Sequence, residues 1–324
     1  MRTTTPSSAP GTSAAGLPTP DLLASDPVPT SGERALVLGG GGSTGNAWLI
    51  GVVAGLADAG LDVSTTADLT VGTSAGATTA AQLAGATPAE LYAAALVAPT
   101  RPQAGQGGSN TGSDRTRQAA DQMARTAAVV AGAQDAADMR RRLGAAALAL
   151  PSSSDEAVQS RWRATVAARL PDPSWPLRAV LLTAVDARTG ESAVFDRHSG
   201  VDLVDAVAAS CASGFAYQVG EGQYLDGGYR RNENADLAAG HRRVLVLSPF
   251  GGRTRAPLDW GLQLAVQVDE LCARGSKVEV IVPGPAADHL FGPQAMDLSL
   301  RPAAAAAGYE RGTALAERVA ALWR

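Results

Sequence analysis

The sequence contains few histidines, cysteines or aromatic residues. Its 324 residues include three histidines, two cysteines and 4% aromatic side chains. Two cysteines far apart, Cys211 and Cys272, do not make a disulfide framework and are typical of a reducing compartment. The histidines do not have metal-ligand spacing with any cysteine or carboxylate pair. We therefore expect no metal ion and no other cofactor.

Long apolar runs and a strong net charge are missing as well. No apolar stretch reaches the roughly 18 residues that a membrane span requires, and the first residues lack the apolar segment of a secretory signal. The net charge is −4 with both signs scattered, which argues against a nucleic-acid partner. These absences predict a cytoplasmic protein that binds no nucleic acid. Any membrane contact would be peripheral and transient.

Alanine, glycine and short apolar runs dominate what is present. Residues 1–32 are rich in Ser, Thr, Pro and Gly, so we expect a disordered tail followed by one domain at 33–324. Strand patterns at 35–38 and 68–71 alternate with a helix pattern at 47–59 and a second helix after residue 76. This alternation is typical of a parallel sheet with helices on its faces.

The rest of the chain extends the same pattern. A Gly/Ser/Pro-rich linker begins at residue 99, and helical segments continue to about residue 170. The block 99–170 is either a helical insertion that caps the site or an ordinary helical excursion of the domain. Further strands are predicted at 178–185, 192–195, 243–247 and 278–282, and further helices at 201–212, 262–274 and 303–322. The predicted fold class is α/β, with a central, mostly parallel sheet flanked by helices on both faces.

Residues 72–76 read G-T-S-A-G, which fits the G-x-S-x-G nucleophile elbow. This motif needs an apolar strand before it and a helix after it, and both are predicted here. The sharp turn requires very small residues on both sides of the serine, because neighbouring backbone passes close by. Gly72 and Gly76 meet this requirement. The pattern predicts that Ser74 is a nucleophile.

Residues 39–45 read G-G-G-G-S-T-G directly after the first predicted strand. Such a loop presents backbone N–H groups that can form an oxyanion hole or bind a phosphate group or a dinucleotide. We expect the N–H groups of Gly40, Gly41 and Gly42 to form an oxyanion hole, with Gly45 supporting the turn.

A nucleotide-binding α/β domain that uses only this loop is an alternative, because the loop also fits G-x-G-x-x-G. That reading needs an acidic residue at the end of the second strand. Asp58 and Asp62 have suitable spacing but fall in or just past the predicted helix, and the second strand ends in the serine motif instead. No G-K-[ST] follows, so a P-loop does not fit.

Asp226-Gly227-Gly228 is the third motif. Asp-Gly alone is a common turn sequence and says little about function. It becomes informative here because a glycine turn places a carboxylate well downstream of the serine elbow. A Ser-Asp-His hydrolase would need His241 or His289, and the chain order permits either. Neither histidine sits in a distinctive motif, and both read as surface residues.

Together and in this order, the three motifs resemble those of the patatin-like phospholipase family: a G-G-G-x-R-G loop, a G-x-S-x-G elbow and a D-G-[GA] triplet. The resemblance extends over most of residues 34–282, apart from the helical insertion. It implies a three-layer α/β/α fold and hydrolysis of acyl esters of phospholipids or other lipids. It also implies a catalytic dyad without histidine, in which Ser74 is the nucleophile and Asp226 is the base, with Gly227 and Gly228 supporting the aspartate.

The chain departs from the family pattern in the glycine loop. The family often has an arginine before the last loop glycine, where this chain has Thr44. The missing arginine charge bears on the rate or on the preference for anionic head groups. A catalytically idle relative that binds lipid or acts as a scaffold is a second alternative.

Overall fold

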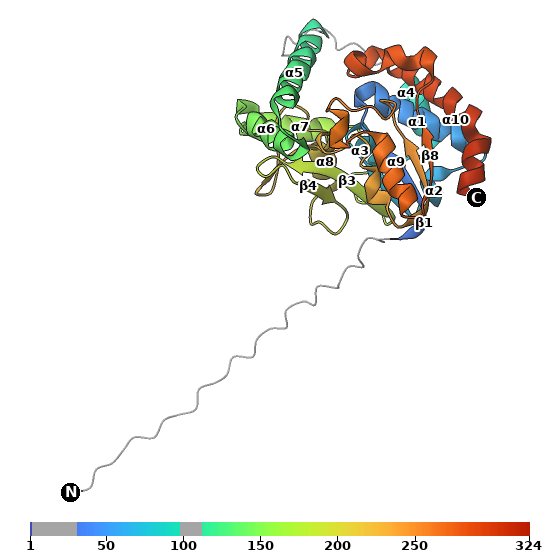
Figure 1. The fold of residues 1–324 in the computed structure, drawn as a ribbon, viewed down its shortest axis with the longest axis horizontal. Coiled ribbons are helices and arrows are strands. Elements are labelled where there is room, and N and C mark those ends of the chain that lie inside the picture. Colours follow the sequence, from blue (N-terminus) through green and yellow to red (C-terminus); the bar gives the residue numbers. More distant parts are fainter. Residues whose placement is uncertain (2–30, 98–111) are drawn as a thin grey trace.

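The structure is a computed structural model that describes Met1 and residues 31–97 and 112–324. In these residues, eight strands form one sheet in the order β5-β6-β3-β2-β1-β7-β8, with β4 also paired to β3 (Figure 1). The strands are β1 (Gly32–Leu38), β2 (Leu69–Gly72), β3 (Ala179–Asp186), β4 (Ser192–Phe195), β5 (Tyr217–Val219), β6 (Gly222–Asp226), β7 (His241–Leu247) and β8 (Lys277–Ile281). The pairs among β3, β2, β1, β7 and β8 are parallel, whereas β4, β5 and β6 pair antiparallel. The predicted three-layer α/β/α fold with a mostly parallel sheet is confirmed.

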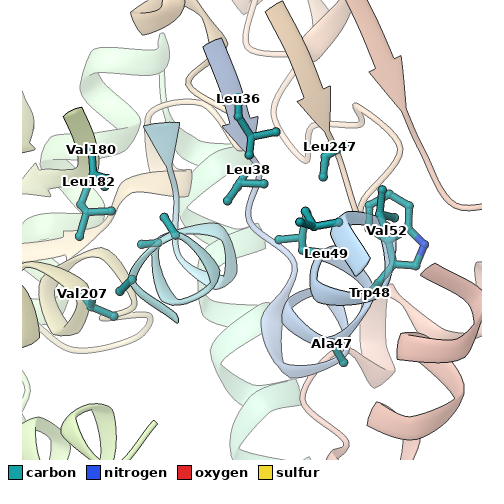
Figure 2. Close-up of a cluster of buried hydrophobic side chains, with 14 of the residues drawn as sticks. Leu36, Leu38, Ala47, Trp48, Leu49, Val52, Val180, Leu182, Val207 and Leu247 are labelled. Atoms are coloured by element: carbon teal, nitrogen blue, oxygen red, sulfur yellow. The ribbon is translucent and has the colours of Figure 1, made fainter. Parts of the chain in front are cut away.

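The helices cover both faces of this sheet. They are α1 (Gly42–Asp58), α2 (Val63–Thr66), α3 (Ala75–Gly85), α4 (Pro88–Leu96), α5 (Gly112–Gly132), α6 (Ala136–Leu148), α7 (Glu156–Ala167), α8 (Leu203–Ser210), α9 (Leu264–Ala273) and α10 (Arg301–Trp323). Successive strand residues point to opposite faces. Leu36 and Leu38 of β1 pack with residues of α1, α3, α8 and α10, and Figure 2 shows the part of this cluster around Trp48. Ala35 and Val37 pack on the other face, against α9.

Helices α1 and α10 pack through glycines that interlock. A Cβ atom at Gly51 or Gly55 of α1 would overlap backbone carbonyls of α10, those of Ala305 and Tyr309. In return, a Cβ atom at Gly308 or Gly312 of α10 would overlap backbone carbonyls of α1. The two backbones are therefore in direct contact, and the helix that follows the glycine loop is fixed by the C-terminal helix.

Most predicted elements are present, and the differences are local. The helix predicted at 47–59 begins earlier, at Gly42, because the glycine loop leads directly into it. The short hairpin of β5 and β6 was not predicted. The predicted tail and most of the predicted linker lie outside the described residues. Within 99–170, helix α5 stands out from the body of the molecule (Figure 1). No helix in the described part of the chain is long and apolar enough to cross a membrane.

Candidate active site

Ser74 lies in the turn between β2 and α3. Its backbone has φ 53° and ψ −112°, and only one other non-glycine residue among those described, Asn234, has a positive φ. Such a conformation costs about 1–3 kcal/mol and persists only where the surroundings enforce it. A Cβ atom at Gly72 would lie 2.7 Å from the Cα atom of Ala77, and one at Gly76 would overlap the carbonyl of Leu38. The elbow predicted from the sequence is therefore present, and its flanking glycines have a steric cause.

Residues at the end of α8 hold the backbone of the elbow. The N–H of Ser74 donates to Ser210 Oγ at 2.9 Å, and its carbonyl accepts from Cys211 Sγ at 3.2 Å and from Thr78 Oγ1 at 3.4 Å. Burial, helped by the charge of Asp226, raises the pKa of the Cys211 thiol to about 12. The thiol therefore stays protonated and acts as a hydrogen-bond donor, not as a nucleophile. Sequence reasoning missed this role, because nothing near Cys211 in the sequence marks a contact with Ser74.

Asp226 ends strand β6 and is 9% exposed. Its N–H donates to Ala212 O at 2.9 Å, and its Oδ1 accepts from the N–H of Gly228 at 2.8 Å. A Cβ atom at Gly227 would overlap the backbone and hydroxyl of Thr183, which explains the first glycine of the triplet. The unpredicted hairpin thus delivers the predicted carboxylate.

Burial raises the pKa of the Asp226 carboxyl to about 6. Three groups oppose this rise: the Ser74 hydroxyl first, then the N–H of Gly228 and the charge of Arg255. The Ser74 hydroxyl is therefore close enough to stabilise the carboxylate. Among the described residues the two side chains do not meet the distance and angle of a standard hydrogen bond, a common state of catalytic pairs before substrate binds.

A buried amide connects the serine and aspartate motifs. Asn234 Nδ2 lies within donating distance of Thr73 Oγ1 (3.0 Å), Thr183 Oγ1 (3.1 Å) and Gly227 O (3.2 Å). Asn234 is fully buried and adopts a left-handed backbone conformation with φ 52°. Since it touches residues on both sides of the Ser74–Asp226 pair, it fixes their separation.

Of the three loop N–H groups expected to form the oxyanion hole, two are free and one is engaged within the described chain. Gly40 donates its N–H to Asn232 O at 2.9 Å, and Asn232 Nδ2 donates back to Gly40 O at 3.2 Å. Gly40 is therefore wrong as an oxyanion donor, because its N–H already has an acceptor. The N–H groups of Gly41 and Gly42 have none in the described chain, and they lie at the start of α1, where backbone N–H groups and the helix dipole favour negative charge. Gly45 donates back to Gly41 O at 3.0 Å and closes the turn.

A buried carboxyl group lies beneath this loop. Glu233 is 0% exposed and accepts from Ser248 Oγ at 2.7 Å, Asn232 Nδ2 at 2.9 Å and Gln267 Nε2 at 3.4 Å. Burial raises the pKa of Glu233, and these hydrogen bonds partly offset the rise. Glu233 orients Asn232, which in turn holds Gly40, so the glycine loop depends on a residue that the sequence did not single out.

The histidines do not join the site. His241 is 1% exposed, so its reading as a surface residue is wrong. It pairs with Gly32 at the start of β1, whereas Ser74 follows the strand level with Leu38. Six strand residues separate these levels, or about 20 Å. His289 is exposed, and its Nδ1 lies 3.0 Å from Ala286 O in its own turn.

The acidic residues weighed for nucleotide binding are engaged elsewhere. Asp58, at the end of α1, accepts a hydrogen bond from the hydroxyl of Tyr309, and Asp62 caps α2. Neither lies at the end of β2, so the loop lacks the acidic partner of a dinucleotide site.

Comparison with known proteins agrees with this geometry. The model of the family described as patatin-like phospholipase matches residues 36–239, well over half of the chain. The chain belongs to the patatin-like phospholipase family. The resemblance read from the three motifs is thereby confirmed, and it supports a lipid acyl hydrolase in general terms. A comparison with curated proteins gives no match. Among solved structures, VipD from Legionella pneumophila is similar over 88% of this chain and 67% of that chain, with 13% identity and a TM-score of 0.39.

The span matched by the patatin-like model contains the glycine loop, Ser74 and Asp226, and it ends before α9, β8 and α10. Thr44, at the position where the family often has arginine, is fully buried and donates its N–H to Ala295 O at 3.0 Å. The part of the chain beyond the matched span thus supports the loop inside it.

Proposed function

We propose that this patatin-like protein hydrolyses carboxylic ester bonds of lipids through a Ser74–Asp226 dyad and an acyl-enzyme. The observation that carries the proposal is the strained Ser74 beside a buried Asp226 whose pKa is raised to about 6. An exposed aspartate titrates near 3.9 and is a weak base, whereas one that titrates near 6 is stronger and is still mostly ionised at neutral pH. We also propose a cytoplasmic enzyme that touches lipid surfaces peripherally and transiently.

The first half of the reaction forms the acyl-enzyme. Ser74 Oγ attacks the ester carbonyl carbon while Asp226 takes the hydroxyl proton. The oxyanion that develops lies against the free N–H groups of Gly41 and Gly42, and loss of one such donor costs about 3 kcal/mol in comparable sites. Asp226 then returns the proton to the leaving alcohol oxygen as the carbon–oxygen bond breaks.

The second half releases the acid. Water attacks the acyl carbonyl carbon, and Asp226 again accepts the proton. Collapse of the second tetrahedral intermediate breaks the bond to Ser74 Oγ, which takes the proton back from Asp226. Fatty acid leaves, and both side chains return to their starting states.

The test is hydrolysis of a p-nitrophenyl ester series and a phospholipid panel, together with labelling by a fluorophosphonate. We expect Ser74→Ala to lose turnover and labelling, and Asp226→Asn to remain folded with little activity. Ser154→Ala is the matched control, because Ser154 is an exposed serine whose hydroxyl, among the described residues, bonds to Pro151 O alone, in its own turn. Labelling of Ser74→Ala at the parent's rate would contradict the proposal.

Three outcomes would redirect the assignment. If the folded parent cleaves no ester, a catalytically idle, lipid-binding or scaffold role becomes the better reading. If nucleotides raise the melting temperature of the parent, the glycine loop serves a different ligand. An active Asp226→Asn variant would reject the dyad but not hydrolysis itself.

A further inference from the structure

A guanidinium group from the last helix lies against the first turn of α1. Arg301, the first residue of α10, donates from Nη1 to Ser43 O at 2.8 Å and to Ser43 Oγ at 3.2 Å, and from Nη2 to Asn46 Oδ1 at 3.0 Å. Ser43 directly follows the free N–H group of Gly42. A positive charge is thereby present beside the loop, although Thr44 itself carries none.

The backbone of a second arginine, Arg169, is connected to Arg301 through side-chain amides. Asn46 Nδ2 donates to Gln82 Oε1 at 2.9 Å, and Gln82 Nε2 donates to Arg169 O at 3.0 Å. The Arg169 guanidinium lies over the Trp162 ring, 5.5 Å from its centroid.

The charge of Arg169 reaches both Arg301 and the elbow. Burial, followed by the charge of Arg169, lowers the pKa of Arg301. The same charge also partly offsets the rise in the pKa of Cys211, whose thiol donates to the Ser74 carbonyl. Arg301 therefore lies beside the glycine loop, and Arg169 lies close enough to Arg301 and Cys211 for its charge to act on both.

Neither guanidinium has a carboxylate partner among the side chains that the structure describes. Other arginines of the protein do: Arg163 pairs with Asp205 at 2.9 Å, and Arg231 pairs with Glu270 at 2.6 Å. Within residues 31–97 and 121–324, no carboxylate oxygen lies within 4.0 Å of Arg169 or Arg301, and Nε of Arg301 has no acceptor. Two neighbouring guanidiniums without acidic partners repel each other, and an anion held between them would remove that repulsion.

We propose that Arg169 and Arg301 form an anion subsite that binds a phosphate group on the alcohol side of the ester cleaved at Ser74. This inference rests on the proposed function. The planar fork of guanidinium donors matches phosphate oxygens, and both side chains are accessible, since Arg169 is exposed and Arg301 is partly so. The same chemistry would bind the head group of a lipid or free phosphate.

The first arm of the test measures kcat/KM for two soluble esters below the concentration at which they aggregate, 1-hexanoylglycerol and 1-hexanoylglycerol 3-phosphate. These differ only in the phosphate. We expect the parent to prefer the phosphate ester, and Arg169→Gln or Arg301→Gln each to reduce that preference about tenfold, as loss of a charge-assisted hydrogen bond does. Arg301→Lys should retain part of it, because the charge remains but the fork is lost.

The matched control is Arg161→Gln, since Arg161 is an exposed arginine of α7 that forms no ion pair in the described chain. It removes the same charge and should leave the preference unchanged. A parent without preference overturns the proposal. So does an equal loss on both esters in the Arg169 and Arg301 variants, because that result would show only support of the loop.

The second arm measures binding without turnover. Calorimetry with glycerol 3-phosphate and with inorganic phosphate uses Ser74→Ala protein, alone and combined with each arginine substitution. Weaker binding in the arginine variants supports the subsite. Tighter binding of glycerol 3-phosphate then assigns it to a lipid head group, and equal binding assigns it to free phosphate. No binding, or binding unaffected by the substitutions, overturns the subsite. Binding without any ester turnover in the parent would instead reject the proposed function and keep the subsite.

Discussion

Replacing Asp226 by asparagine should make the protein more stable at neutral pH while removing its activity. Burial raises the pKa of this carboxyl from 3.8 to about 6. The rise of roughly 2.2 pH units corresponds to about 3 kcal/mol at 1.36 kcal/mol per unit. When Asp226 is ionised, the free energy of unfolding is lower by about this amount. Asparagine is neutral and keeps an oxygen that accepts from the Gly228 N–H, so it should recover most of this energy.

The free energy of unfolding depends on pH, because Asp226 has a higher pKa in the folded state than in the unfolded state. Between pH 3.8 and 6 the folded state holds a proton on Asp226 that the unfolded state has released. The free energy of unfolding of the parent therefore falls as pH rises through this window, by up to about 1.4 kcal/mol per pH unit from this group. Below pH 3.8 both states are protonated, and the contribution is at its largest. The advantage of Asp226→Asn should accordingly be near zero at pH 3.5 and reach about 3 kcal/mol at pH 7.5.

Urea unfolding of both proteins at four or five pH values between 3.5 and 7.5 measures this difference. Ester hydrolysis on the same preparations measures the loss of function. A difference in unfolding free energy that does not change with pH would refute the reasoning, because no other group distinguishes the two proteins. A variant less stable than the parent at pH 7.5 would also refute it.

Three further predictions concern the surroundings of the dyad. Arg255→Gln should move the acid limb of the kcat/KM profile to higher pH, because the charge of Arg255 lowers the pKa of Asp226; a profile with an unchanged midpoint would contradict this. Gly76→Ala should cost about 3 kcal/mol or more in urea unfolding, because its Cβ atom meets the Leu38 carbonyl. In Gly284→Ala the Cβ atom meets nothing within 4 Å, and equal stability of the two variants would reject the packing argument. Glu233→Gln should lower the unfolding free energy by about 1–3 kcal/mol and reduce kcat, because an amide N–H₂ would face neighbours that donate; a variant with parental stability and kcat would contradict this.

Local patterns in the sequence were enough to predict the elements that place the nucleophile. Residues 87–90 read T-P-A-E, the sequence pattern of a capping box with proline at the first helical position, and at the start of α4 Thr87 and Glu90 do bond reciprocally. The strand–turn–helix around Ser74 also depends on adjacent residues, namely an apolar run and Gly72, where a Cβ atom would meet Ala77. The motif includes Gly76 as well, although the group that excludes a Cβ atom there is the Leu38 carbonyl of β1. Wherever the determining contacts lie within a few residues, pattern and propensity were sufficient.

What the sequence did not predict depends on distant partners. Strand β6 is short and polar at its start, and it exists because it pairs with β3, about 40 residues earlier. Ser210 meets the Ser74 backbone across 136 residues, and Asn232 meets Gly40 across 192. Nothing local distinguishes these polar residues from those of an ordinary loop. The Gly40 N–H is a similar case. The loop motif predicts that this group is free to bind substrate, whereas in the fold it donates to the carbonyl of Asn232.

The interlocked glycines of α1 and α10 have a consequence for protein synthesis. The helix that follows the glycine loop emerges from the ribosome well before α10, the helix against which it packs. At roughly 5–20 residues per second, the interval between them is on the order of tens of seconds. During that time Ser43 lacks its arginine contact and the loop lacks its rear support. The nascent chain should therefore remain unreactive toward a fluorophosphonate until α10 has been synthesised, so that the reactivity of Ser74 requires α10 as well as the residues around the serine.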